Sequence, residues 1–107
     1  MELKELKELL ESAIGKNKVA YRAFPEGKAP KLPFICYMVS GTDNFVADSK
    51  VYEKRTEVDI ELYTAIKDVS TEDVVEEAFN DASIIWDKTE EYLDDEQCYE
   101  IIYTIII

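Results

Sequence analysis

The clearest alternation of apolar and polar positions in the chain is the stretch TEVDIELYT at residues 56–64. Apolar side chains face one way and carboxylates the other: Val58, Ile60 and Leu62 against Glu57, Asp59 and Glu61. This period of two predicts a half-buried β-strand. The acidic side holds no basic residue, so it poses a question: metal site, catalytic pair, surface for a basic partner, or plain solvated surface.

Helical spacing of apolar residues predicts two helices. The first spans residues 2–14 as an amphipathic helix, with Gly15 placed to end it. The second spans about residues 71–83, with Ser70 as the expected N-cap and acids in its first turn. We expect its buried stripe to comprise Val74, Val75, Ala78, Phe79 and Ala82.

Further strands are expected on both sides of the second helix. Residues 18–24 form a short strand, and residues 34–41 are apolar on both faces, as a central strand covered on each side would be. Residues 84–93 and 98–107 form the last two strands, the final one rich in β-branched residues and central. All three prolines lie in the segment 25–33, which predicts an irregular loop.

The middle of the chain predicts a projecting hairpin. Residues 42–50 form a polar connection with a hydrophobic tip at Phe45 and Val46, and a long strand then covers residues 51–66. The first half of that strand is mostly polar on both faces, which favours an extension beyond the packed core.

The predicted order is α-β-β-β-α-β-β in a single domain, residues 1–107. Only the second helix separates successive strands, so the sheet is expected to be mostly antiparallel, with about four to five strands. Two helices with one apolar stripe each cover one face of it. The sequence therefore predicts a two-layer α+β fold with both helices on one face.

The charge narrows the classes of partner. The chain has 24 acids and 12 bases, a formal net charge of −12. Such a chain repels nucleic acid and anionic membranes, whereas basic partners remain open. Charges run through residues 1–15, and the closing IIYTIII is too short to cross a bilayer. We expect a cytosolic protein without a membrane segment.

The sequence gives little support for a catalytic site or a metal site. The chain has no histidine, its three glycines are scattered, and its acid-containing turns at 41–44 and 94–97 lack a calcium-loop pattern. Carboxylates two residues apart on a strand lie roughly 7 Å from each other, but any acidic strand face has such pairs. We expect no catalytic residue, metal or cofactor, and reduced core cysteines at Cys36 and Cys98, although these could face each other across neighbouring strands.

The chain carries more bulky tyrosines than one covered sheet face accounts for, namely Tyr37, Tyr63, Tyr92, Tyr99 and Tyr103. A twisted sheet could bury them in the monomer. Association between subunits is the favoured alternative, because interfaces are enriched in tyrosine. An interaction protein is thus preferred over an enzyme.

Two phrases in this layout, PKLPFICY and VDIELY, resemble the tail-terminator proteins (tail-completion, head–tail joining) of tailed phages and prophages, similar in plan to the lambda tail terminator. The resemblance covers nearly the whole chain and rests on layout and phrasing, since the family has no catalytic signature. It implies a homo-oligomeric ring, typically a hexamer, that caps the tail tube and receives the head connector. DNA would pass through without specific binding. The protein would lie in the virion, after assembly in the host cytoplasm.

Carried to this sequence by position, the resemblance implies candidate interface and lumen residues. The tip would touch the next ring, and the strand 51–66 would line the channel or join subunits. The candidates are Phe45, Val46, Tyr52, Lys54, Arg55, Glu57, Asp59 and Glu61. A tail-terminator role and a neck or connector role share the same physics and both stay open.

A different class of function also fits the size and charge. An acidic inhibitor, such as an immunity protein that neutralises a basic nuclease toxin, would use its carboxylates to steer onto a basic active site. It would be a monomer in solution.

Overall fold

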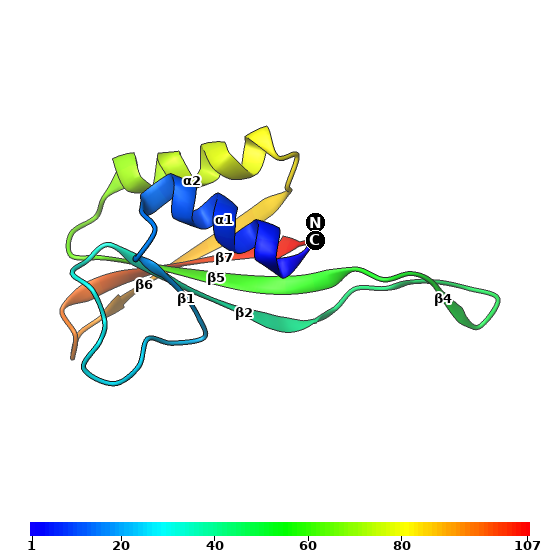
Figure 1. The fold of residues 1–107 in the computed structure, drawn as a ribbon, viewed down its shortest axis with the longest axis horizontal. Coiled ribbons are helices and arrows are strands. Elements are labelled where there is room, and N and C mark those ends of the chain that lie inside the picture. The colour runs from blue at the N-terminus through cyan, green and yellow to red at the C-terminus, as the bar shows by residue number, and fades with distance from the viewer.

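The computed structural model describes all 107 residues and confirms the α+β class (Figure 1). Two helices, α1 (Leu3–Ile14) and α2 (Val69–Asp81), cover one face of a five-stranded sheet. The strands stand in the order β1-β2-β5-β7-β6, and only β1 and β2 run parallel. Their bounds are β1 Val19–Tyr21, β2 Phe34–Thr42, β5 Thr56–Thr64, β6 Trp86–Leu93 and β7 Cys98–Ile106.

The first helix forms and ends close to the predicted residues. Glu2 and Glu5 form a reciprocal capping box at its start, and Gly15 ends it with a φ of 124°, which favours glycine. Leu6 and Leu10 are buried on the face that packs toward the sheet. The periodicity of leucines therefore predicted this element and its buried face correctly.

The second helix begins two residues earlier than expected, and the N-cap prediction was wrong. Asp68, not Ser70, accepts a hydrogen bond from the Thr71 amide at 3.1 Å. Within the predicted stripe Val75 and Phe79 are fully buried, but Val74 is exposed. With this earlier start, the buried residues of the helix are Val75, Phe79 and the acid Glu72.

The central strand of the sheet is β5, with β2 and β7 hydrogen-bonded to it. The core lies between this sheet and the helices. Its sheet side consists of alternate residues from the three inner strands: Ile35, Tyr37, Val58, Ile60, Leu62, Ile101, Tyr103 and Ile105. The last strand was predicted to be central; β7 is an inner strand, paired with β5 on one side and with the charged edge strand β6 on the other, but the centre is β5.

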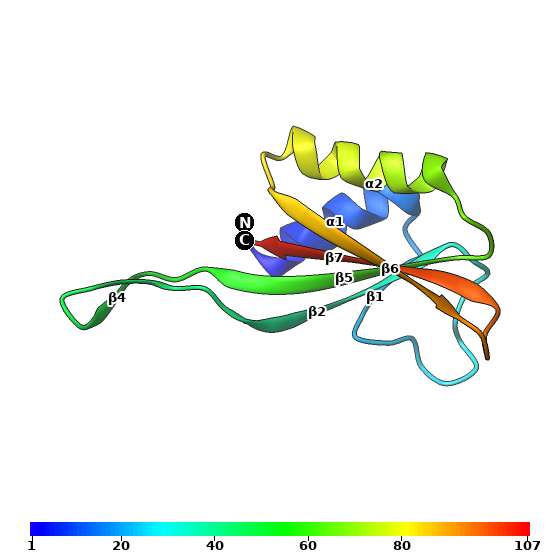
Figure 2. The same cartoon turned by 180° about the vertical axis from the view of Figure 1, so that it is seen from behind.

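Below the sheet, the proline-containing segment covers part of the opposite face (Figures 1 and 2). The predicted strand 18–24 stops at Tyr21 because Arg22 turns to a positive φ of 66°. The chain then loops under the sheet and packs Phe24 edge-on against Phe34, with ring centroids 5.3 Å apart. This loop shelters one end of the face that carries no helix.

The predicted long strand 51–66 is interrupted, and that prediction was wrong. The chain forms a separate two-stranded hairpin, β3 (Phe45–Ala47) and β4 (Lys50–Glu53), before β5 begins at Thr56. We call residues 43–55 the arm. It projects from one end of the body, as expected from the polar first half of the stretch, and gives the molecule extents of 49 × 28 × 24 Å (Figure 2).

Local contacts explain how the arm turns and where it is attached. The tip is at Asp48 and Ser49, so its predicted place at Phe45 and Val46 was wrong, since these two lie on β3. Asp48 and Ser49 both have positive φ, 53° and 61°, as in the type I′ turns that fit twisted hairpins. At its root the Arg55 side chain donates to the Asp43 carbonyl at 2.9 Å and pairs with the Asp43 carboxylate at 3.2 Å. The Arg55 amide donates to the Asn44 side chain. These bonds end the strand pairing and start the arm.

Both cysteines are free and buried, on the sheet face opposite the helices. Cys36 lies on β2 and Cys98 on β7, and β5 separates the two strands. The alternative in which they face each other across neighbouring strands is therefore wrong.

Candidate functional site

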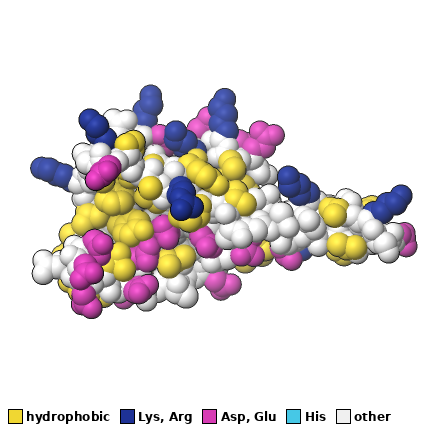
Figure 3. Space-filling view, turned by 90° about the horizontal axis from the view of Figure 1, so that it is seen from below, with side chains coloured by type: hydrophobic (Ala, Val, Ile, Leu, Met, Phe, Trp, Pro, Cys, Tyr) yellow, Lys and Arg dark blue, Asp and Glu magenta, His cyan; other side chains and the backbone are white.

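The face of the sheet that carries no helix is the first candidate surface, and we call it the open face (Figure 3). Glu57, Asp59 and Glu61 point to it from β5, away from the core, as their alternation predicted. All three are half-buried rather than fully solvated. Figure 3 shows acidic side chains gathered on this side, around apolar atoms near the end of the body away from the arm.

None of these three carboxylates forms an ion pair within the chain. Glu57 accepts a hydrogen bond from the Ser40 hydroxyl at 3.2 Å, and Asp59 accepts one from Thr104 at 3.3 Å. Neutral hydroxyls satisfy some of their hydrogen-bonding capacity but leave their charge uncompensated. The row therefore presents a negative surface to whatever lies opposite it.

Glu61 belongs to a tighter cluster that the sequence analysis missed. The Tyr63 hydroxyl lies 2.8 Å from Glu100 Oε2 and 3.1 Å from Glu61 Oε1. One hydroxyl has one proton, so it donates to a single carboxylate, and the shorter contact is to Glu100. The register that sets Tyr63 opposite Glu100 brings the acids together, and no cation lies in the cluster.

The electrostatics of this cluster follow from burial and like charge. Burial, followed by the charge of Glu100, raises the pKa of Glu61. Burial also raises the pKa of Tyr63, helped by its hydrogen bond to Glu100. Burial and the charge of Glu61 raise the pKa of the nearby Cys36 thiol. A thiol held protonated in this way is a poor nucleophile.

Metal binding has no obvious place in the fold. No group of three or more histidine, cysteine, aspartate or glutamate side chains is arranged to hold a metal ion. The carboxylates of the open face instead spread along a strand, which suits a broad surface more than a focused centre.

The arm is the second candidate surface. Its large apolar side chains are exposed in the monomer: Phe45, Val46, Val51 and Tyr52, the last at 78%. Phe45 and Tyr52 stack edge-on with centroids 5.9 Å apart, and Val46 pairs across the strands with Val51. None of them belongs to the hydrophobic core. A lone two-stranded hairpin is marginally stable in water, so such a surface favours a partner.

The residues predicted as interface or lumen candidates thus fall on separate surfaces. Phe45, Val46 and Tyr52 lie on the arm, whereas Glu57, Asp59 and Glu61 lie on the open face. Lys54 and Arg55 lie at the arm's root, where the Arg55 charge is neutralised by Asp43. The structure does not bring the eight residues together into one site.

The interpretation of the tyrosines as surplus surface was wrong for two of them. Tyr37 is 5% exposed and Tyr103 is fully buried in the monomer core, where Tyr103 stacks on Phe79. Only Tyr92 of the five is exposed. The aromatic groups available to a partner are instead Tyr52 and Phe45 on the arm, with Tyr21 and Tyr92 on the body.

A charged cluster between α2 and β6 is a further feature that the sequence analysis missed. Glu72 is 1% exposed and accepts hydrogen bonds from Lys67 at 2.6 Å and Lys88 at 3.0 Å. Lys88 also bonds Glu76 at 2.6 Å. Every charge in this cluster has a partner, so it is a structural clamp rather than a binding site. The acids of this cluster are paired with lysines, whereas the acids of the open face have no ion-pair partner.

Comparisons with known proteins do not assign the chain to a family. The chain matches no protein-family model, and no curated protein matches it. Neither helix is long and apolar enough to span a membrane.

Proposed function

We propose that the chain is a structural, non-enzymatic subunit of the head–tail region of a tailed phage or prophage. Copies of it would assemble as a ring, six-fold by resemblance, that caps the tail tube and joins it to the head connector. It would be a virion protein assembled in the host cytoplasm. The observation that carries the proposal is the arm, an exposed apolar hairpin that projects from the body and has no partner within the chain.

The arm supports assembly because exposed apolar patches on a small protein mark contact surfaces. Tyr52 and Phe45 also have the chemistry of interface anchors, since aromatic residues dominate the binding energy of many interfaces. A monomeric protein with no partner gains nothing from holding these side chains in water.

The open face supports the idea of a channel wall. DNA gains affinity when basic side chains displace its counterions, and a row of uncompensated carboxylates offers no such gain. With Glu57, Asp59 and Glu61 lining a channel, DNA would pass without sticking. If these acids instead form ion pairs with Lys50, Lys54 or Arg55 of a neighbouring copy, the channel-wall role fails.

The test is binding to tail tubes. Tubes that lack a terminator are incubated with the wild-type chain and with the double variant Phe45→Ser/Tyr52→Ser, and sedimented together. Lys7→Met, a change at an exposed residue of α1, is the matched control. We expect the wild type and the control to sediment with tubes and the double variant to stay in the supernatant. A wild-type chain that never binds tubes contradicts the proposal.

The uncompensated acids also support a second candidate, the acidic inhibitor of a basic nuclease. That function needs a monomer whose affinity for the nuclease falls steeply with salt. It gives no role to the apolar arm. Charge-neutral Glu57→Gln/Asp59→Asn/Glu61→Gln would abolish nuclease inhibition, whereas binding to tail tubes would survive this change.

A further inference from the structure

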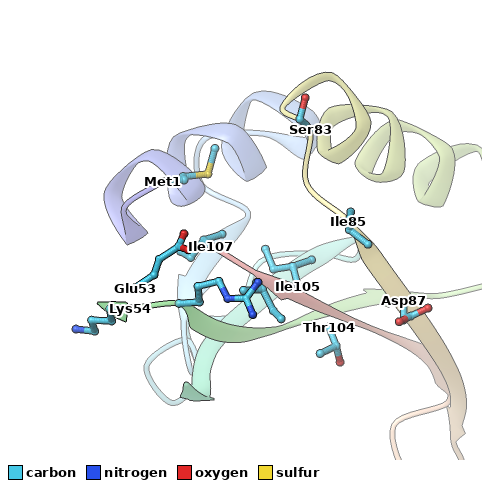
Figure 4. A pocket seen from close by; sticks show the side chains of 11 residues that line it. Met1, Glu53, Lys54, Ser83, Ile85, Asp87, Thr104, Ile105 and Ile107 are labelled. Atoms are coloured by element: carbon cyan, nitrogen blue, oxygen red, sulfur yellow. The ribbon is translucent and has the colours of Figure 1, made fainter. Parts of the chain in front are cut away.

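The body has a groove that an arm could enter. A groove of about 510 Å³ lies at the end of the body from which the arm leaves. Body residues Ile85, Asp87, Thr104, Ile105 and Ile106 line it, together with the arm's root at 53–55 (Figure 4). Figure 4 shows Ile85 just before β6 and Asp87 on β6, next to Ile105 and Thr104 of the neighbouring strand β7.

The groove is apolar where the arm is apolar. Ile85 is 88% exposed, the most exposed large hydrophobic residue in the chain, and Ile106 beside it is 39% exposed. Its volume is within the range of concave sites that bind small ligands. An aromatic side chain such as Tyr52 would cover both isoleucines.

The distribution of charge along the chain is compatible with a second copy as the partner of the arm. Three acids and three bases cancel within the arm, so the net charge of −12 rests entirely on the rest of the chain. Two bodies of this charge repel each other, and the arm, which has no net charge, adds nothing to that repulsion. Lys50 near the tip and Asp87 in the groove have no ion-pair partner within the chain. Their charges are complementary.

Other surfaces suit the arm less well. The groove takes in the end of the open face next to the arm, where Thr104 and Asp87 lie. The rest of that face is acidic, and the chain's own loop around Phe24 and Leu32 covers part of its apolar end. The edge strand β6 carries a series of charges, Asp87, Lys88, Glu90 and Glu91, a pattern that blocks strand addition.

We propose that the arm of one copy docks in this groove of a second copy, with Tyr52 against Ile85 and Lys50 near Asp87. The occupant is thus another copy of this chain. This inference rests on the self-assembly part of the proposed function. Because the groove lies at the root of the arm, a reciprocal exchange between two copies closes a dimer. The same contact passed on to a third copy builds a ring.

Cross-linking between two variants tests the contact. Tyr52→Cys and Ile85→Cys each change an exposed side chain, and the native Cys36 and Cys98 are buried. The two variants are mixed and treated with a short bismaleimide. We expect cross-linked pairs in the mixture, at a yield at least tenfold above that of either variant alone. Replacing Ile85→Cys by Asp94→Cys, in the turn before β7, is the matched control and should give no product.

Two results would overturn the docking. The first is cross-linking of Tyr52→Cys with itself as readily as in the mixture, because arms would then pair with arms. The second is no product in the mixture at the highest protein concentration reached. Circular dichroism of each variant confirms that it is folded.

The mass of the cross-linked species separates this inference from the proposed function. Dimers alone would support the docking and contradict the ring. A ring without the 52–85 product would support the proposed function and overturn the docking.

Discussion

The clamp around Glu72 yields a quantitative prediction about how α2 is fixed to the sheet. The Glu72 side chain is 2% exposed, while its partners Lys67 and Lys88 are 43% and 36% exposed. Removing either end of an ion pair breaks the same bond, but it leaves behind different groups. The cost should therefore depend on how deeply the remaining group is buried.

Lys88→Met keeps the aliphatic stem and removes the charge. It breaks the bonds to Glu72 at 3.0 Å and to Glu76 at 2.6 Å, leaving a fully buried carboxylate with Lys67 alone. Hydrogen bonds to charged groups contribute about 1.5–3 kcal/mol each, less when the donor is partly solvated. We expect a loss of about 2–3 kcal/mol in the free energy of unfolding.

Glu72→Met removes the buried carboxylate instead. Lys67 and Lys88 stay partly solvated and keep Glu90 and Glu76 as partners. The lost bonds are offset by the desolvation that Glu72 no longer suffers, so we expect a loss of about 1 kcal/mol or less. Urea unfolding measures both variants, with a constant m-value as evidence that the folded and unfolded states are comparable. Lys7→Met on exposed α1 is the control. A Glu72→Met variant less stable than Lys88→Met would refute this reasoning.

Three further predictions concern the helix cap, the open face and the arm. Asp68→Ala should cost about 1 kcal/mol of unfolding free energy at neutral pH, because it removes the N-cap of α2. The Thr71 bonds lower the pKa of Asp68, so the difference should shrink as pH falls through that pKa, and a pH-independent difference would argue against the cap. Glu61 behaves oppositely, because its raised pKa stabilises the fold at low pH and this contribution is lost as pH rises. The melting temperature of Glu61→Gln, compared with that of the wild type, should therefore be higher at pH 7 than at pH 4. A variant whose melting temperature falls further below that of the wild type at pH 7 than at pH 4 would contradict this. Phe45→Ser/Tyr52→Ser should change the unfolding free energy of the monomer by less than about 0.5 kcal/mol, since both side chains lie outside the core; a larger loss would mean that the arm packs on its own body.

The fold was predictable where one periodicity dominated. The leucines of α1 and the alternation in β5 each fix one buried face, and the structure keeps both. The N-cap of α2 was not predictable in the same way, because Asp68 and Ser70 are both good caps two residues apart. The helix starts at the earlier one, since the Asp68 carboxylate bonds both the amide and the hydroxyl of Thr71.

The surfaces depended more on contacts between distant residues. The break before Thr56 follows from Arg55 bonding Asp43, a contact across the root of the hairpin. The cluster of Tyr63 and Glu100 follows from strand register, which joins residues 37 positions apart. No local pattern encodes such a pairing, although the alternation in β7 gives the face on which Glu100 lies.

Electron microscopy of tail tubes incubated with the chain tests whether it assembles into a ring on a phage tail through its arm. A ring of copies is expected at one end of each tube. In that ring the arm of every subunit, with Tyr52, would lie in the groove beside Ile85 of its neighbour. Tubes with bare ends, after incubation with folded protein in excess, would contradict this assembly.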